Sequence, residues 1–249
     1  MGTAADAAWK AADVAHGYLD DRRRAIPLWA EQKDLLCRLV DRLERPVQRF
    51  LDLGAGDGVL TEAILERVPA SEAVLVDFSA PMLAAAAARL KPKSGRWRAV
   101  EADLASPGWI DVLASPAGYD LVLSGFCIHH LRDERKRQLY GEVFDLLAPG
   151  GAFLNMEHVS APEAARGMLD ERMIEDLIRL EQDSEEPRTA AAVAAEYHAR
   201  PDAAANKLVD PVVQCGWLRE IGFERVDLFF RWLELALFGG VKPRSGGGV

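Results

Sequence analysis

A glycine-rich loop between a short apolar segment and an amphipathic one constrains the fold of this 249-residue chain more than any other feature. The loop is Gly54-Ala55-Gly56-Asp57-Gly58. Residues 49–53 before it form an apolar run typical of a buried strand, and residues 59–67 after it carry the apolar spacing of a helix. Because glycine lets the backbone turn tightly and approach a ligand closely, this turn predicts a nucleotide-like ligand at the edge of an open α/β sheet.

The spacing of the glycines distinguishes two kinds of ligand. A dinucleotide-binding turn has the pattern G-x-G-x-x-G and holds a pyrophosphate at the helix N-terminus. Here the third glycine comes one residue early, and Asp57 inside the loop would repel a pyrophosphate, which disfavours a nicotinamide oxidoreductase. A carboxylate suits a ligand with an ammonium or sulfonium group instead. The loop resembles motif I of the class I S-adenosylmethionine-dependent methyltransferases, and this implies S-adenosylmethionine as cofactor and S-adenosylhomocysteine as product.

Two further segments carry the resemblance at the expected spacing. Residues 73–77 form a second apolar strand that ends in Asp77, about 20 residues beyond the loop, where a carboxylate binds ribose hydroxyls. A helix cap is the alternative for this residue, because a helix start follows it. Residues 97–101 predict a third strand, and Asp103 after it resembles the family's contact to the adenine amine, for which a carboxylate is a suitable acceptor.

The fourth predicted strand, residues 119–124, leads into a segment that borders the methionine part of the cofactor in this family. The resemblance therefore implies a set of cofactor-binding residues along the first four strands. These are Asp52, Gly54, Ala55, Gly56, Gly58, Asp77, Phe78, Met82, Asp103, Leu104, Ser124 and Phe126.

The remaining segments complete the fold that the resemblance implies from Gln48 onward. A helix ending at Pro149-Gly150 opens a fifth strand at residues 152–156, and a helix over residues 211–223 stops at Gly222. Two β-rich runs follow, with a bulge expected at Gly239-Gly240. We expect a Rossmann-like α/β fold: a mostly parallel seven-stranded sheet of order 3-2-1-4-5-7-6, with helices on both faces and a helical cap.

The chain is expected to form one domain with four parts. These are N-terminal cap helices (1–46), the cofactor-binding core (47–160), a helical lid insertion (161–210), and the last helix with antiparallel strands (211–249). The insertion is too long for a simple connection, which favours a cap over the acceptor pocket.

Candidate substrate contacts lie in the N-terminal part and after the fifth strand. Tyr18, Arg22 and Trp29 precede or begin a helix, with Pro27 expected in its first turn, and arginine suits an anionic group. A solvated helix face is the alternative for the arginines. Glu157 and His158 follow the fifth strand, at the sheet edge where ligands bind.

His129 and His130 are the candidate catalytic bases, because they follow the fourth strand and imidazole titrates near neutral pH. A structural role in the loop is the alternative. Adjacent residues point to opposite sides, so at most one member of each pair, His129-His130 or Glu157-His158, is expected to face the pocket. No metal-binding spacing joins these four side chains, and no metal is expected.

Composition limits the partners. The formal net charge of -9 disfavours a large nucleic-acid surface, since such surfaces neutralise phosphates. No run reaches the ~20 apolar residues of a membrane span, and the start lacks a signal peptide's basic flank, so we expect a cytoplasmic protein without membrane contact. Cys37, Cys127 and Cys215 form no C-x-x-C pair. The expected partner is a small-molecule acceptor, with a homodimer left open.

Three functions agree with the sequence. The first is a methyltransferase acting on a small molecule by in-line displacement. The second is a carboxy-S-adenosylmethionine synthase, to which residues 18–29 and 217–241 are similar. The third is a non-catalytic S-adenosylmethionine-binding protein, because a fold does not establish an activity. The sequence does not define the acceptor, or whether oxygen, nitrogen, carbon or sulfur is methylated.

Overall fold

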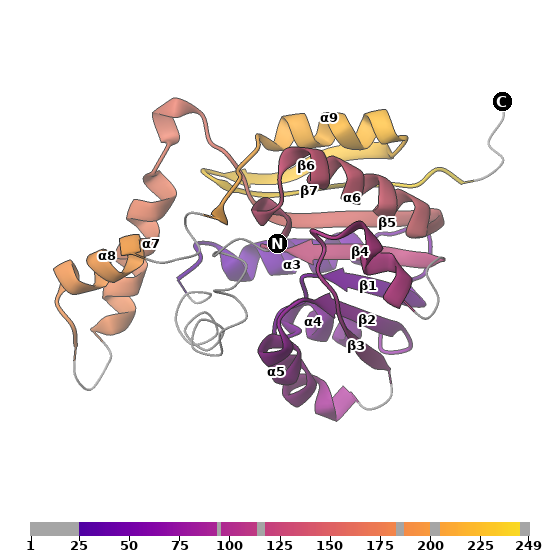
Figure 1. Cartoon of the computed structure of the whole chain (residues 1–249), viewed down its shortest axis with the longest axis horizontal. Coiled ribbons are helices and arrows are strands. Elements are labelled where there is room, and N and C mark those ends of the chain that lie inside the picture. The colour runs from indigo at the N-terminus through magenta and orange to yellow at the C-terminus, as the bar shows by residue number, and fades with distance from the viewer. Residues whose placement is uncertain (1–24, 94–95, 114–117, 183–186, 200–204, 245–249) are drawn as a thin grey trace.

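A single seven-stranded sheet organises the protein, whose computed structural model describes residues 25–93, 96–113, 118–182, 187–199 and 205–244 (Figure 1). The strands are β1 Arg49–Leu53, β2 Glu72–Asp77, β3 Trp97–Glu101, β4 Tyr119–Gly125, β5 Leu147–His158, β6 Glu224–Trp232 and β7 Leu235–Val241. Their order is β3-β2-β1-β4-β5-β7-β6. Strands β1 to β5 are parallel, whereas β7 runs antiparallel to both β5 and β6. The predicted fold class and strand order are confirmed.

Helices cover both faces of the sheet. The α-helices are α3 Trp29–Val40, α4 Val59–Arg67, α5 Ala80–Leu90, α6 Asp133–Leu146, α7 Met168–Glu181, α8 Ala190–Ala199 and α9 Pro211–Ile221. Apolar side chains of α3, α4 and α5 form one core with one face, and those of α6 and α9 form a second core with the other. The helices of the two layers leave the carboxyl ends of β1, β2 and β4 uncovered, as in other open α/β sheets.

The fifth strand is longer than predicted. It begins at Leu147 directly after α6, includes Pro149, and continues to His158. Its register against β4 shifts between Tyr119 and Leu121, and this irregularity accommodates the proline and the glycines that suggested a turn.

The bulge suggested at Gly239-Gly240 lies opposite these glycines, in the partner strand β6. Strand β7 pairs regularly with β5 through both glycines, and the register shifts lie in the partner strand β6. A Cβ atom on Gly239 would lie 2.0 Å from the Phe153 carbonyl oxygen, and one on Gly240 would lie 2.9 Å from Val226. The two glycines therefore permit close approach of neighbouring backbones.

The start of α3 also differs from the prediction. Helix α3 begins at Trp29 with Leu28 as its N-cap, so Pro27 lies just before the helix instead of in its first turn. The Pro27 carbonyl accepts a hydrogen bond of 2.9 Å from the buried Gln32 side chain. This contact fixes the chain where it enters the helix.

Helices α7 and α8 project beyond the carboxyl ends of β4 and β5 (Figure 1). The Tyr197 hydroxyl of α8 donates a 2.6 Å hydrogen bond to Asp170 of α7, which holds the two helices together. Leu169 of α7 packs with Ile26 and with Leu235 of β7. The insertion thus contacts the main body through the start of α7. In the described part of the chain, no helix combines the length and apolar character that a membrane span requires.

Candidate functional site

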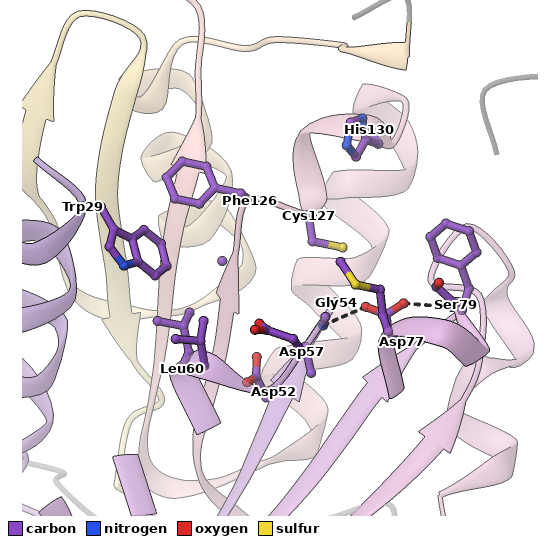
Figure 2. Close-up of a pocket in the computed structure, with 16 residues that line it drawn as sticks. Trp29, Asp52, Gly54, Asp57, Leu60, Asp77, Ser79, Phe126, Cys127 and His130 are labelled. Atoms are coloured by element: carbon purple, nitrogen blue, oxygen red, sulfur yellow. Dashed lines mark hydrogen bonds between the residues drawn. The ribbon is translucent and has the colours of Figure 1, made fainter. Parts of the chain in front are cut away.

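A pocket opens at the carboxyl edge of the sheet, where the glycine-rich loop after β1 meets the ends of β2 and β4 (Figure 2). Trp29 from α3 and His130 from the turn after β4 complete its wall. The cavity measures about 90 Å³, below the ~300–1,000 Å³ of common ligand pockets.

The glycines of the loop have distinct roles. Gly54 adopts φ +65°, and a Cβ atom there would lie 2.1 Å from the Cys127 Sγ. Gly54, Ala55 and Gly56 line the pocket. Gly58 does not: it is the N-cap of α4, and a Cβ atom there would lie 3.2 Å from side chains of α5. The first two glycines thus allow a ligand to approach the backbone, whereas Gly58 allows α4 and α5 to pack together.

Asp52 brings a buried carboxylate to the floor of the pocket. The residue is 1% exposed, and its Oδ2 accepts a 2.7 Å hydrogen bond from the Thr61 hydroxyl. Its Oδ1 has no hydrogen-bond partner among the described residues. Burial raises the pKa of Asp52 to about 7. A buried carboxylate oxygen without a partner fits a ligand that supplies a positively charged hydrogen-bond donor such as an ammonium group.

Asp57 is paired within the protein, which the sequence did not reveal. Its carboxylate forms a 2.5 Å ion pair with Arg89 of α5, and Arg89 also donates to the Asp57 carbonyl. Asp57 lines the pocket, but because its negative charge is already balanced by a guanidinium, it is less suited to attract a cation than the sequence suggested. Asp52, whose Oδ1 has no partner among the described residues, is better suited to that role.

The position of Asp77 agrees with both alternatives that the sequence left open, because the residue bonds to an amide at the start of α5 and also lines the pocket. Its Oδ1 accepts a 2.8 Å bond from the Ser79 amide at the start of α5, and its Oδ2 accepts a 2.9 Å bond from the Gly56 amide. Both bonds are visible in Figure 2 as contacts between β2, the glycine-rich loop and the α5 N-terminus. Asp77 also lines the pocket together with Phe78 and Met82. The carboxylate therefore fixes the loop and faces the ligand space at once.

Besides Gly58, three predicted cofactor residues lie away from the pocket wall. Asp103 is exposed and accepts a 2.9 Å bond from the Ala105 amide, which stabilises a turn. Leu104 belongs to the hydrophobic core. The Ser124 hydroxyl is buried and donates to the Leu53 carbonyl at 2.8 Å, which joins β4 to β1. Their cofactor contacts therefore stay predictions.

Only one of the two histidines after β4 faces the pocket, as predicted, although both lie in a 3-10 helix, Ile128–His130, and not at a strand end. His130 lines the pocket, whereas His129 is buried behind it and its Nδ1 lies 2.5 Å from Glu157 Oε1. The two imidazole rings lie 3.9 Å apart. Neither Glu157 nor His158 is on the pocket wall.

Backbone amides fix the Glu157 side chain in its position beside His129. The amides of His129 and His158 donate to the Glu157 carboxylate at 3.0 and 2.8 Å. Burial, with smaller contributions from Lys136 and Lys207, lowers the pKa of His129 to about 3. Burial raises the pKa of Glu157 to about 7. Both shifts favour the uncharged form of each group, so His129 is a neutral imidazole at pH 7.

Two aromatic side chains form the remaining side of the pocket. Trp29 and Phe126 have ring centroids 6.1 Å apart. Phe126 adopts φ +51°, a strained conformation for a bulky residue that is typical of functional sites. Tyr18 and Arg22 lie outside the described residues.

The sequence missed five residues of the pocket wall, which are Val59, Leu60, Ser79, Gly125 and Cys127. Cys127 follows the end of β4, a position from which a wall residue could have been inferred. No group of three metal-binding side chains occurs within the described ranges.

Known proteins resemble the part of the chain that builds this pocket. Residues 51–153 match a family model described as a methyltransferase domain. The chain is 35% identical over 149 residues to demethylmenaquinone methyltransferase of Thermus thermophilus, which covers 59% of this chain and 58% of that protein. It is 37% identical over 118 residues to trans-aconitate 2-methyltransferase of Streptomyces avermitilis, over 47% and 41% of the two chains. The chain thus spans about half the length of these relatives.

A solved structure extends the similarity beyond the matched domain. Human N-acetylserotonin methyltransferase, in complex with S-adenosylmethionine, superposes with a TM-score of 0.58 at 15% identity, over 95% of this chain and 58% of that chain. At this identity the similarity establishes the fold. It includes the segments outside residues 51–153, so the whole sheet follows one architecture.

Proposed function

Because this chain belongs to the class I S-adenosylmethionine-dependent methyltransferases, we propose that it transfers a methyl group from S-adenosylmethionine to a small-molecule acceptor and releases S-adenosylhomocysteine. The observation that carries the proposal is the buried Asp52 carboxylate with an unpartnered oxygen beneath the glycine-rich loop. Demethylmenaquinone and trans-aconitate, which appear in the names of two relatives, are small molecules and support a small acceptor.

The residues of the pocket fit the parts of this cofactor. Asp52 would accept from the ammonium group of the methionine moiety, and Asp77 would accept from the ribose hydroxyls. Phe78 and Met82 would enclose the adenine. Gly54 and Gly56 would leave room between them for the ligand to reach the backbone. When bound, the cofactor supplies a methyl group on a positively charged sulfur, which is already activated for transfer.

The protein's main task is then to position the acceptor and exclude water. Trp29 and Phe126 form an apolar wall that would orient an acceptor in the pocket. Orientation of two reactants can lower a barrier by ~7–11 kcal/mol. We assign residues 161–210 the role of a lid, supported by the contact of α7 with Ile26 and Leu235 beside this wall.

His130 is our candidate for the general base. It lines the pocket, and an imidazole accepts a proton near neutral pH. A base is required when the acceptor is a hydroxyl group or an acidic carbon. His129 and Glu157 would position this residue from behind, because the rings of His129 and His130 are in contact.

Identification of the natural ligand tests this function. The protein is purified without added ligand and denatured, and any released small molecule is identified by mass spectrometry. Titration calorimetry then measures the affinity for S-adenosylmethionine and S-adenosylhomocysteine. We expect one of these two ligands to be released or to bind tightly, and a screen of small acceptors would follow.

Two other outcomes would favour the alternative functions. Release of a carboxylated sulfonium would indicate a carboxy-S-adenosylmethionine synthase. Absence of any adenosyl ligand, together with absence of binding, would contradict the proposed function and indicate that the fold is retained without the cofactor.

A further inference from the structure

A second cavity lies beside the cofactor pocket and has no assigned ligand. It is an open groove lined by residues 26–28, by α7, and by Trp232 of β6. Its volume is about 530 Å³, within the ~300–1,000 Å³ of common small-molecule sites and larger than the pocket beneath the loop. We call this cavity the α7 groove. It is large enough for a molecule of several fused rings or an equivalent chain.

The walls of the α7 groove differ in character. One side is apolar and consists of Ile26, Pro27, Leu28, Leu180 and Trp232. The other side carries the charged groups of Arg172, Asp176 and Arg179. A ligand that fills this groove must therefore be apolar along most of its length and polar on one side or at one end.

The charged side favours an anion. Asp176 Oδ2 lies 2.9 Å from Arg172 Nε, and its Oδ1 lies 2.5 Å from Arg179 Nη1, so two guanidinium groups share one carboxylate. These three lining side chains carry a net charge of about +1 by the usual ionisation of Arg and Asp. Glu175 also lies 4.0 Å from Arg172, but its side chain is 62% exposed and it does not line the groove.

The geometry of the arginines suits recognition of a carboxylate or phosphate. A guanidinium has five donors, and the bonds to Asp176 engage only part of them. The Asp176 side chain is 16% exposed and fixes both arginines on one face of α7. Because the pair is already ordered, less side-chain entropy is lost when an anion binds.

One apolar cluster joins the groove to the cofactor pocket. Ile26 and Trp232 line the groove, and Trp29 and Phe126 line the pocket. All four belong to the cluster that surrounds Leu169. The two spaces share no lining residue, so a molecule bound in the groove would lie next to side chains that pack against the aromatic wall at which we expect methyl transfer.

We propose that the α7 groove binds the acceptor, and that the acceptor is an amphipathic molecule with an apolar body and an anionic group. The body lies against Trp232 and Leu180, the anion lies at Arg172 and Arg179, and the reacting end is directed toward the cluster that packs against Phe126. The proposal rests on the proposed function, because it names the class of substrate for the same site.

Three probes that share a naphthalene ring and differ in the charge of their substituent test whether the groove prefers an anionic ligand. They are 2-naphthoate, 2-naphthalenemethanol and 2-naphthylmethylammonium, and each is titrated calorimetrically into the full chain with S-adenosylhomocysteine present. We expect 2-naphthoate to bind at least tenfold more tightly than the alcohol and the ammonium to bind most weakly. Equal affinities, or no binding of 2-naphthoate up to millimolar concentration, would overturn the proposal.

Variants locate the probe. Arg172→Gln and Arg179→Gln should each weaken the binding of 2-naphthoate about three- to tenfold and leave the affinity for the alcohol unchanged. Trp232→Ala should weaken the binding of both probes. Arg38→Gln is the matched control, because Arg38 is also an exposed arginine in an i,i+4 pair, with Asp34 at 2.5 Å. An equal loss in the Arg38→Gln variant would indicate non-specific charge and contradict the assignment.

The same experiments separate the two proposals. S-adenosylhomocysteine affinity is measured without probe in every variant. Intact affinity with no probe binding would reject the groove and leave the methyltransferase function standing. Probe binding without any S-adenosylhomocysteine binding would reject the methyltransferase function and retain an anion-binding groove.

Discussion

Replacement of Asp52 by asparagine should stabilise the ligand-free protein at alkaline pH and weaken its binding of S-adenosylhomocysteine. Burial raises the pKa of Asp52 from 3.8 to about 7 in the folded protein. The folded state thus holds the proton more tightly than the unfolded state, and stability falls as the pH rises from about 4 to 7. At 1.36 kcal/mol for each pKa unit, the ionised carboxylate costs the folded state about 4 kcal/mol above pH 7.

The amide cannot ionise, so the variant loses this pH dependence. The asparagine oxygen can still accept a hydrogen bond from Thr61. Its NH₂ group takes the place of the unpartnered Oδ1, and this buried donor without an acceptor destabilises the folded state by ~1–3 kcal/mol. The expected net gain at pH 8 is therefore ~1–3 kcal/mol. At pH 5 the wild-type carboxyl is protonated, and the two proteins should unfold at nearly the same temperature.

Ligand binding should change in the opposite direction. A hydrogen bond between an ammonium and a carboxylate contributes ~1.5–3 kcal/mol, so Asp52→Asn should weaken S-adenosylhomocysteine binding about 10- to 150-fold. Below pH 7 the free wild-type protein must release a proton from Asp52 before it binds the cation. Wild-type affinity should consequently rise with pH between 6 and 8, whereas that of the variant should not.

Two measurements check these expectations. Thermal unfolding is followed at pH 5 and pH 8, and calorimetric titration is carried out in two buffers of different ionisation heat, which reveals the released proton. Ser124→Ala is the control: it removes the buried bond to Leu53 but no charge, so it should lower stability and leave affinity unchanged. If Asp52→Asn binds with wild-type affinity and the same pH profile, Asp52 does not contact the ligand.

Three other changes have defined outcomes. Asp77→Ala should weaken S-adenosylmethionine binding by ~1.5–3 kcal/mol and lower the melting temperature, since two backbone amides lose their acceptor; an unaltered affinity in calorimetry would exclude Asp77 from the site. His130→Ala should change cofactor affinity by no more than a few fold relative to the wild type but reduce turnover of an acceptor that must lose a proton. Unchanged turnover would contradict the assignment of His130 as the general base. Gly54→Ala should lower the melting temperature and abolish cofactor binding because of the Cys127 Sγ at 2.1 Å. The matched change Gly216→Ala, in α9 where a Cβ meets no described atom within 4 Å, should stabilise by ~0.4–1 kcal/mol; a loss there would contradict the packing argument.

Most strands were predictable because their signals are local. Residues 49–53 and 97–101 are bounded as the apolar pattern indicated. The start of β5 was not predictable in this way. Gly150 and Gly151 resemble a turn, but their backbone groups pair with Lys242, about 90 residues later. A non-local partner thus decided the conformation that local propensity left open.

The residues of the candidate site were likewise predictable where their signal is local and not where it depends on a distant partner. The glycine-rich loop and Asp77 were identified because a turn and a strand end are visible in a few consecutive residues. The suitability of Asp57 for a cation was overestimated because the residue that neutralises it, Arg89, lies 32 positions away on α5. Sequence reveals which groups are charged, and only the fold reveals which charges are already balanced.

The position of His130 depends on groups that the sequence did not connect with it. The turn that carries it is held from one side by Glu157, which accepts from the His129 amide. It is held from the other side by Lys207, whose amide donates to the His129 carbonyl at 2.9 Å and whose ammonium donates to the His130 carbonyl at 3.0 Å. Lys207 belongs to the segment that returns from α8 to α9, at the end of the insertion. The insertion and the pocket wall are therefore joined by direct hydrogen bonds to the backbone of His129 and His130, and a displacement of that segment would be transmitted to the proposed base.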